Sequence, residues 1–148
     1  GKELSHRTSR RPHTPFNHKD CEKARSGVTI GRGYDLGQQA KPGEYDTWKK
    51  RDEIKKPTQA QRDAIRRVQA VYELFTNSPA DTPPGIGLTP AQADVYLGAL
   101  GKKGCDAETY LNDHRQEFAE LTAPQQKLLF EIVYDKYVTS AKKVLRNR

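Results

Sequence analysis

The chain has 148 residues, which is the length of about one domain and too short for two large ones. Only 34% of its residues are hydrophobic, so a folded structure has to be argued from local patterns. With 26 basic and 19 acidic side chains the net charge is +7, which favours a polyanionic partner such as nucleic acid, an acidic membrane or an anionic cell wall. No apolar run approaches the roughly 18 residues that a membrane-spanning helix needs.

The N-terminal segment is dense in Arg, Lys, His and Pro over residues 1–25. Its apolar residues show no period, so we predict at most one short helical turn followed by a long irregular loop. The chain begins with Gly1, contains no Met, and has no charged head followed by an apolar run. We therefore expect no secretory signal, and a single domain, residues 1–148, that is part of a longer protein.

The segment 26–38 differs in composition from what precedes it. Val28 and Ile30 alternate with Thr29, as in a strand with two faces. Glycines in or just after a short strand allow sharp bends or a close approach of another backbone. We predict a short β-hairpin here, with three glycines at Gly31, Gly33 and Gly37.

From residue 57 onward the pattern predicts helices. A threonine followed three residues later by a glutamine is a capping box, in which the two side chains satisfy otherwise unpaired amides at a helix start. The sequence contains three such pairs, at Thr58 and Gln61, Thr89 and Gln92, and Thr122 and Gln125.

Apolar residues at spacings of three and four predict a helix of about five turns after the first box, ending before Asn77. The second helix starts with Pro90, where the missing amide costs nothing, and is expected to run to about Leu100. Asp106 is expected to cap a further helix, and Ser140 to restart a short basic helix at the end of the chain.

The helix after the third box is the most apolar. We expect its core-facing side chains to include Leu128, Leu129, Ile132, Val133 and Tyr137. The fold class that follows is α+β, mainly α-helical with one small β-hairpin near the N-terminus.

The chain has two cysteines, Cys21 and Cys105. Neither belongs to a closely spaced metal-binding pair, so a redox motif is not predicted. A bond between them would close a loop of more than eighty residues and contribute about 4.5 kcal/mol in the chain-entropy model. The sequence leaves a disulfide and two free buried thiols equally open.

The segment Ser26 to Gly37, SGVTIGRGYDLG, closely resembles the signature of the lysozyme-like toxin domains typified by the catalytic domain of pesticin. Those domains are similar to phage lysozymes, and the match covers every fixed position of the signature. The later segments 88–97 and 118–137 agree more loosely with the family's helices. The resemblance implies a lysozyme-like fold and, by position, a catalytic threonine at Thr29 and a catalytic aspartate at Asp35.

The family's catalytic glutamate precedes the signature, and only Glu3 and Glu22 do so here. Glu22 lies seven residues before Thr29, too close to face the hairpin across a cleft from a separate helix end. Glu3 leaves room for a first helix and a return loop, and it is our candidate. The alternative for Glu3 is a solvated terminal carboxylate, and the family's usual Glu-Gly pair is absent.

The same residue types suit glycoside hydrolysis. One carboxylic acid protonates the leaving oxygen, and a second carboxylate activates water or stabilises the oxocarbenium-like centre. Glu3 and Asp35 would supply this pair, with Thr29 holding the attacking water. We expect a carboxyl separation of about 6.5 to 9.5 Å, as in inverting enzymes, and no cofactor.

Two other functions remain open from the sequence. A metal-dependent nuclease could use imidazole, carboxylate and thiolate ligands, although their spacing matches no known motif. A non-catalytic wall- or nucleic-acid-binding module would rest on basic residues alone, without interleaved aromatics. The candidate metal ligands are His6, His13, His18, Asp20 and Cys21.

The sequence thus predicts a muramidase that cleaves peptidoglycan between N-acetylmuramic acid and N-acetylglucosamine. The resemblance further implies an antibacterial toxin module, delivered into the periplasm of a target bacterium and bound by an immunity protein. We expect a monomer with no nucleic-acid partner and no transmembrane segment.

Overall fold

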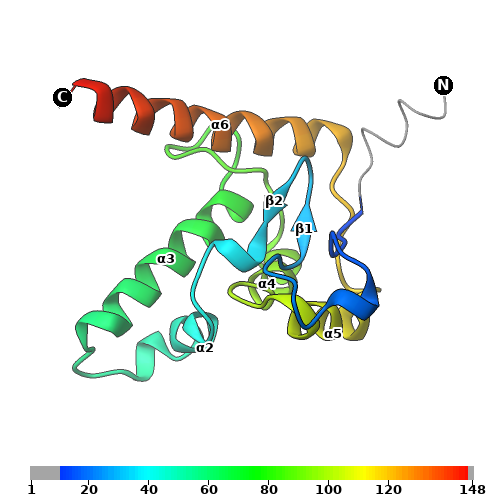
Figure 1. Ribbon diagram of the computed structural model, residues 1–148. Helices are drawn as coiled ribbons and strands as arrows, with labels where there is room; N and C mark the ends of the chain where they lie inside the picture. Colours follow the sequence, from blue (N-terminus) through cyan, green and yellow to red (C-terminus); the bar gives the residue numbers. More distant parts are fainter. Residues whose placement is uncertain (1–10, 147–148) are drawn as a thin grey trace.

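The computed structural model describes residues 11–146, which form a mainly helical α+β arrangement with one small antiparallel hairpin, as predicted (Figure 1). The hairpin lies under the first half of the last helix, and the other helices also lie below that last helix. The strands are β1 (Thr29–Ile30) and β2 (Tyr34–Asp35), and the helices are α2 (Glu44–Lys49), α3 (Gln59–Thr76), α4 (Pro90–Leu97), α5 (Gly104–His114) and α6 (Ala123–Arg146). Short 3-10 turns occur at η1 (His18–Asp20), η2 (Leu36–Gln38) and η3 (Arg51–Glu53).

All three predicted capping boxes are confirmed. The Thr58 and Thr89 hydroxyls accept from the amides of Gln61 and Gln92, and both glutamine side chains accept from the threonine amides. The same reciprocal pair joins Thr122 to Gln125 at the start of α6, at 3.2 and 3.0 Å. The local sequence therefore determines where these helices begin.

Other predicted helix boundaries are wrong by a few residues. α4 ends at Leu97 instead of about Leu100, and the chain then turns through Gly101, whose φ is +76°. α5 begins at Gly104, so that Asp106 lies inside its first turn and is not its N-cap.

Helix α2 was not predicted and is stabilised by contacts with α3. The Trp48 indole donates to Gln69 Oε1 at 2.9 Å, and its ring lies 5.2 Å from that of Tyr72. Glu44 accepts two hydrogen bonds from the Arg67 guanidinium, at 2.9 and 2.6 Å. These hydrogen bonds hold the pKa of the Glu44 carboxyl below its ordinary value.

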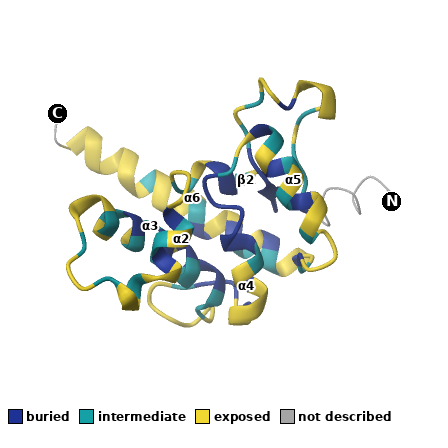
Figure 2. Cartoon of the chain, turned by 90° about the horizontal axis from the view of Figure 1, so that it is seen from below, coloured by how far each residue is buried: buried dark blue, intermediate teal, exposed yellow. Residues whose placement is uncertain are grey.

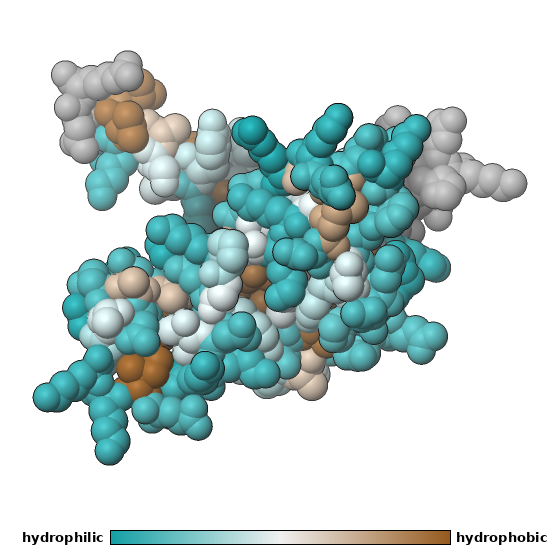
Figure 3. Space-filling view, turned by 60° about the horizontal axis from the view of Figure 1, so that its bottom comes forward, coloured by the Kyte–Doolittle hydropathy of each residue, from teal (hydrophilic) through white to brown (hydrophobic). Residues whose placement is uncertain are grey.

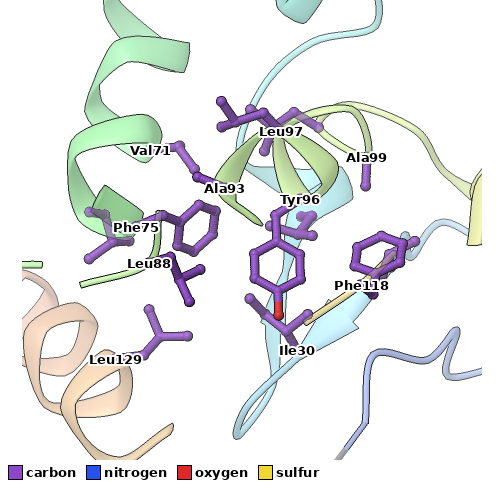
Figure 4. Close-up of a cluster of buried hydrophobic side chains, with 14 of the residues drawn as sticks. Ile30, Val71, Phe75, Leu88, Ala93, Tyr96, Leu97, Ala99, Phe118 and Leu129 are labelled. Atoms are coloured by element: carbon purple, nitrogen blue, oxygen red, sulfur yellow. The ribbon is translucent and has the colours of Figure 1, made fainter. Parts of the chain in front are cut away.

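The hydrophobic core lies around α4, at the meeting point of α3, the hairpin and the start of α6 (Figure 4). Tyr96 and Phe75 are fully buried at its centre, with ring centroids 5.3 Å apart. Ile30 from β1 and Leu129 from α6 extend this cluster, so one face of the hairpin is anchored in the core.

Helix α6 is continuous from Ala123 to Arg146, so the predicted restart at Ser140 is wrong. No Gly or Pro interrupts it after Pro124. Its first half packs on the core through Leu129 and Ile132, whereas its second half extends away from the body and is exposed (Figures 1 and 2). The expectation that Tyr137 faces the core is therefore also wrong, because its side chain is 72% exposed.

Cys21 and Cys105 form a disulfide, which resolves the choice that the sequence left open. The bond ties the segment after η1 to the first turn of α5. Among the described residues, no helix combines the length and the apolar character that crossing a membrane would require.

Candidate active site

The hairpin brings Thr29 and Asp35 directly opposite each other. The register pairs Thr29 with Asp35 and Ile30 with Tyr34. Gly31 and Gly33 form the turn with φ of +55° and +103°, a region that side chains rarely tolerate. Residues opposite each other in an antiparallel pair share a face of the sheet, so the two predicted catalytic residues lie side by side.

The Asp35 carboxylate is fixed by two backbone amides. Its Oδ1 accepts hydrogen bonds from the amides of Gly27, at 3.0 Å, and Gly37, at 2.9 Å. The two glycines pack so closely that a Cβ on Gly27 would lie 2.7 Å from the Gly37 Cα. Only a pair of glycines allows this approach, which sets the direction of the Asp35 side chain.

Thr29 is almost buried beside the same glycine. Its hydroxyl donates to the Gly27 carbonyl at 3.3 Å, and the residue is only 7% exposed. Its backbone also pairs with His13, through N–H···O contacts of 2.7 and 3.0 Å. Gly27 thus orients both residues, one through its carbonyl and the other through its amide.

Asp35 lines a groove of about 420 Å³ that lies between the hairpin and α6. Asp35 is the only carboxylate among the described residues that line this groove, and Thr29 is not one of them. Burial raises the pKa of the Tyr34 phenol, so this side chain stays neutral at physiological pH. The lining consists of Arg32, Gly33, Tyr34, Asp35, Gln38 and Gln39 from the hairpin and η2 and Leu129, Phe130, Val133, Tyr134 and Tyr137 from α6.

Three aromatic residues form the α6 wall of this groove: Phe130, Tyr134 and Tyr137. They are 42%, 58% and 72% exposed and follow each other at helical spacings of four and three. The rings of Phe130 and Tyr134 are nearly parallel, with centroids 5.8 Å apart. The Arg32 guanidinium, at the hairpin turn, lies 5.5 Å from the Phe130 centroid and also lines the groove.

The face of the molecule seen in Figure 3 is mostly hydrophilic, and apolar side chains show near the end of the arm that α6 extends beyond the body. An open apolar wall with a few polar groups is typical of sites for small or linear ligands. The exposed rings of α6 make this groove a candidate for such a site.

Glu3 lies outside the described residues, so its separation from Asp35 stays a prediction. Glu22 lies in an exposed turn and lines a separate surface hollow together with Cys105 and Lys103. It does not line the groove of Asp35.

Of the predicted metal ligands that the structure describes, His18 and Cys21 lie close together beside Glu108, whereas His13 and Asp20 are not part of this group. Cys21 is bonded to Cys105, so its sulfur is not a free thiolate. His13 Nδ1 lies 3.0 Å from the Arg11 carbonyl, whereas His18 Nδ1 lies 2.5 Å from Glu108 Oε1. His6 lies outside the described residues.

Sequence reasoning missed the glycine pair and the aromatic wall. Gly27 and Gly37 stand out only once the hairpin is folded, because their contact joins residues ten positions apart. The aromatic wall did have a signal, the spacing of Phe130, Tyr134 and Tyr137 on one helical face, but the predicted core stripe includes only Tyr137 and leaves the other two unassigned.

Comparisons of the chain with models of protein families, with curated proteins and with solved structures find no significant match.

Proposed function

We propose that the protein is a peptidoglycan muramidase with a lysozyme-like arrangement. The observation that carries the proposal is the position of Asp35: a carboxylate fixed by two amides, opposite a buried threonine hydroxyl, at the edge of an aromatic groove. The signature from Ser26 to Gly37 and the net charge of +7 support the same function.

The proposed reaction is hydrolysis of the bond between N-acetylmuramic acid and N-acetylglucosamine. Asp35 uses Oδ1 for both amides, and its Oδ2 is the oxygen proposed to act as the base or to stabilise positive charge at the sugar. The Thr29 hydroxyl orients the attacking water, and Glu3 donates the proton to the leaving oxygen.

The groove would hold the glycan strand. The faces of sugar rings carry C–H groups that pack on aromatic rings, and the rings of Phe130, Tyr134 and Tyr137 are exposed for such contacts. The two steps along the helix correspond to roughly 6 and 4.5 Å, comparable with the length of one hexose unit. Arg32 would contact carboxylates of the muramyl substituent or stem peptide.

The biological setting is part of the proposal and rests on the family resemblance. We propose a delivered antibacterial effector that acts as a monomer in the periplasm of a target bacterium and is inhibited by an immunity protein. No step of the proposed reaction uses a metal or organic cofactor.

Digestion of purified peptidoglycan tests the function, with mass spectrometry of the released fragments and assay of new reducing ends. The expected products are muropeptides with N-acetylmuramic acid at the reducing end, formed by wild type and not by Asp35→Asn. Cut stem peptides, N-acetylglucosamine reducing ends or degraded DNA would contradict the proposal. Binding to the wall without any cleavage would favour a non-catalytic module.

A further inference from the structure

Two side chains of types that can bind metals, His18 and Glu108, lie near the disulfide, and neither lines the groove. One donor atom each from His18, Cys21 and Glu108 lies within 4.8 Å of the other two. Cys105 is not in this group of three, but its sulfur is bonded to that of Cys21 and is available as a fourth donor once that bond is broken. Together the four residues offer an imidazole nitrogen, a carboxylate oxygen and two sulfurs. In the oxidised chain the two sulfurs are bonded to each other and are not free thiolates.

From this arrangement we propose that reduction of the disulfide creates a zinc site of His18, Cys21, Cys105 and Glu108. A thiol reductant supplies two electrons and two protons, so that the S–S bond breaks, two thiols form and the reductant becomes a disulfide. Zinc then replaces the two thiol protons, which pass to water or buffer. The result is one zinc ion bound by two thiolates, one imidazole and one carboxylate.

The chemistry of the donors selects zinc. Tetrahedral zinc binds thiolate sulfur at about 2.3 Å and imidazole or carboxylate at about 2.0 to 2.2 Å. His18 Nδ1 and Glu108 Oε1 already lie 2.5 Å apart, and these two atoms have to move only slightly further apart for a zinc ion to bind both. Rotation of the two cysteine side chains, whose Cα atoms are 4.7 Å apart, opens the sulfurs to the roughly 3.8 Å edge of a zinc tetrahedron.

The disulfide can be reached by a reductant from the surface. The two cysteines line an open surface hollow of about 290 Å³ together with Lys103. His18 is exposed, whereas the Glu108 side chain is only 16% exposed and therefore has a restricted orientation. Cys105 lies in the first turn of α5, where the helix dipole favours a negatively charged sulfur.

The two states would hold the same segment in place. The disulfide links the turn after η1 to α5, and the zinc site would link the same two elements through four side chains. The chain just before Cys21 contains His13, whose backbone pairs with Thr29 in the hairpin. Zinc would thus preserve this connection in a compartment where the disulfide is reduced.

Zinc binding by the full chain tests the proposal, measured by competition with a chromophoric chelator after reduction by a phosphine and removal of excess reductant. We expect one zinc per reduced chain, none at comparable affinity in the oxidised chain, and a thermal midpoint that zinc raises only in the reduced chain. Cobalt should give thiolate-to-metal charge-transfer absorption in the reduced chain alone.

Single variants identify the donors, all compared in the reduced state so that loss of the disulfide is common to them. His18→Ala and Glu108→Gln should each weaken zinc binding by at least about tenfold. The control is His114→Ala, since His114 lies at the far end of α5, stacked on Tyr110. Equal binding by the oxidised chain, no binding by the reduced chain, or unchanged affinity in both donor variants would overturn the site. None of these results depends on muramidase activity.

Discussion

Asp35 has both a structural and a proposed catalytic role, because its Oδ1 receives the amides of Gly27 and Gly37. An asparagine oxygen can accept the same two hydrogen bonds but cannot act as a base. We expect Asp35→Asn to abolish release of muropeptides and to change the thermal midpoint little. Asp35→Ala should abolish activity and also lower the free energy of unfolding by about 1 to 3 kcal/mol, since two buried amides lose their acceptor.

Calorimetry together with the reducing-end assay separates these two effects. If Asp35→Asn keeps wild-type turnover, Asp35 is only the acceptor that shapes the hairpin, and the proposed mechanism fails.

The Thr29 hydroxyl can be removed without changing the shape of the side chain. Thr29→Val keeps the β-branched form that a strand favours but loses the group proposed to hold water. We expect kcat to fall by at least about tenfold with KM nearly constant, and Thr29→Ser to retain most of the activity. A Thr29→Val enzyme with unchanged kcat would exclude the water-positioning role.

At the scale of elements, α6 packs its first half on the core and carries the aromatic side chains of the proposed glycan-binding groove. We expect Tyr134→Ala and Tyr137→Ala each to raise KM for glycan fragments by about fivefold to tenfold, with little change in kcat. The control is Leu145→Ala, since Leu145 is equally exposed on α6 but does not line the groove.

Fluorescence titration of an inactive Asp35→Asn background with the same fragments would measure binding alone. Equal effects of the groove and control variants would assign the aromatic side chains of α6 to some other contact.

The α2 and α3 helices are joined by an ion pair with a pH dependence of known sign. The pKa of Glu44 is lower in the folded chain than in the unfolded one, because Arg67 donates two hydrogen bonds to it. The ion pair therefore stabilises the fold at pH values above the pKa of Glu44 in the unfolded chain, which is about 4.3. This contribution is lost as the pH falls through the lower pKa of Glu44 in the folded chain.

We expect Glu44→Gln to lower the free energy of unfolding by about 1 kcal/mol at pH 7 and by less at pH 3. Urea unfolding at both pH values measures the difference. A constant difference between the two proteins would show that the charge of Glu44 does not contribute to the stability.

The sequence predicted those elements whose determinants are local. The capping boxes at Thr58 and Thr89 place two helix starts correctly, since the box is built from residues three positions apart. The hairpin was also predicted, from alternation and glycines. α2 was missed because it has only six residues, and its N-cap Gly43 makes no side-chain cap hydrogen bond.

Thr29 and Asp35 were identified from the family resemblance of one short segment, and the structure pairs them in the hairpin. Their catalytic roles stay a prediction. The exposure of Tyr137 was not predictable from periodicity, because an apolar stripe looks alike whether it packs on a core or extends past it. The geometry of Glu3 stays a prediction.

At the scale of the whole molecule, the excess positive charge should govern encounter with the wall. Lys142, Lys143 and Arg146 lie on the exposed second half of α6, beyond the groove. Attraction to an anionic wall is screened over about 8 Å at physiological ionic strength. We expect rising salt to reduce lysis of whole wall fragments by about threefold to tenfold, and to affect hydrolysis of short neutral oligomers much less.

Reversing these three charges to glutamate should reduce sedimentation with wall fragments while leaving oligomer turnover nearly unchanged. If salt affects both substrates equally, the charge acts inside the groove, through Arg32, and not through the field of the molecule.

The bond between Cys21 and Cys105 also makes the molecule a closed ring with two tails. The ring spans a separation of 84 residues and contains the hairpin together with α2, α3 and α4, whereas most of α5 and all of α6 lie on one tail. The exposed loop after α3, around Asp81, belongs to the ring. A protease that nicks this loop would therefore leave two fragments joined as one covalent molecule, which separates only after reduction.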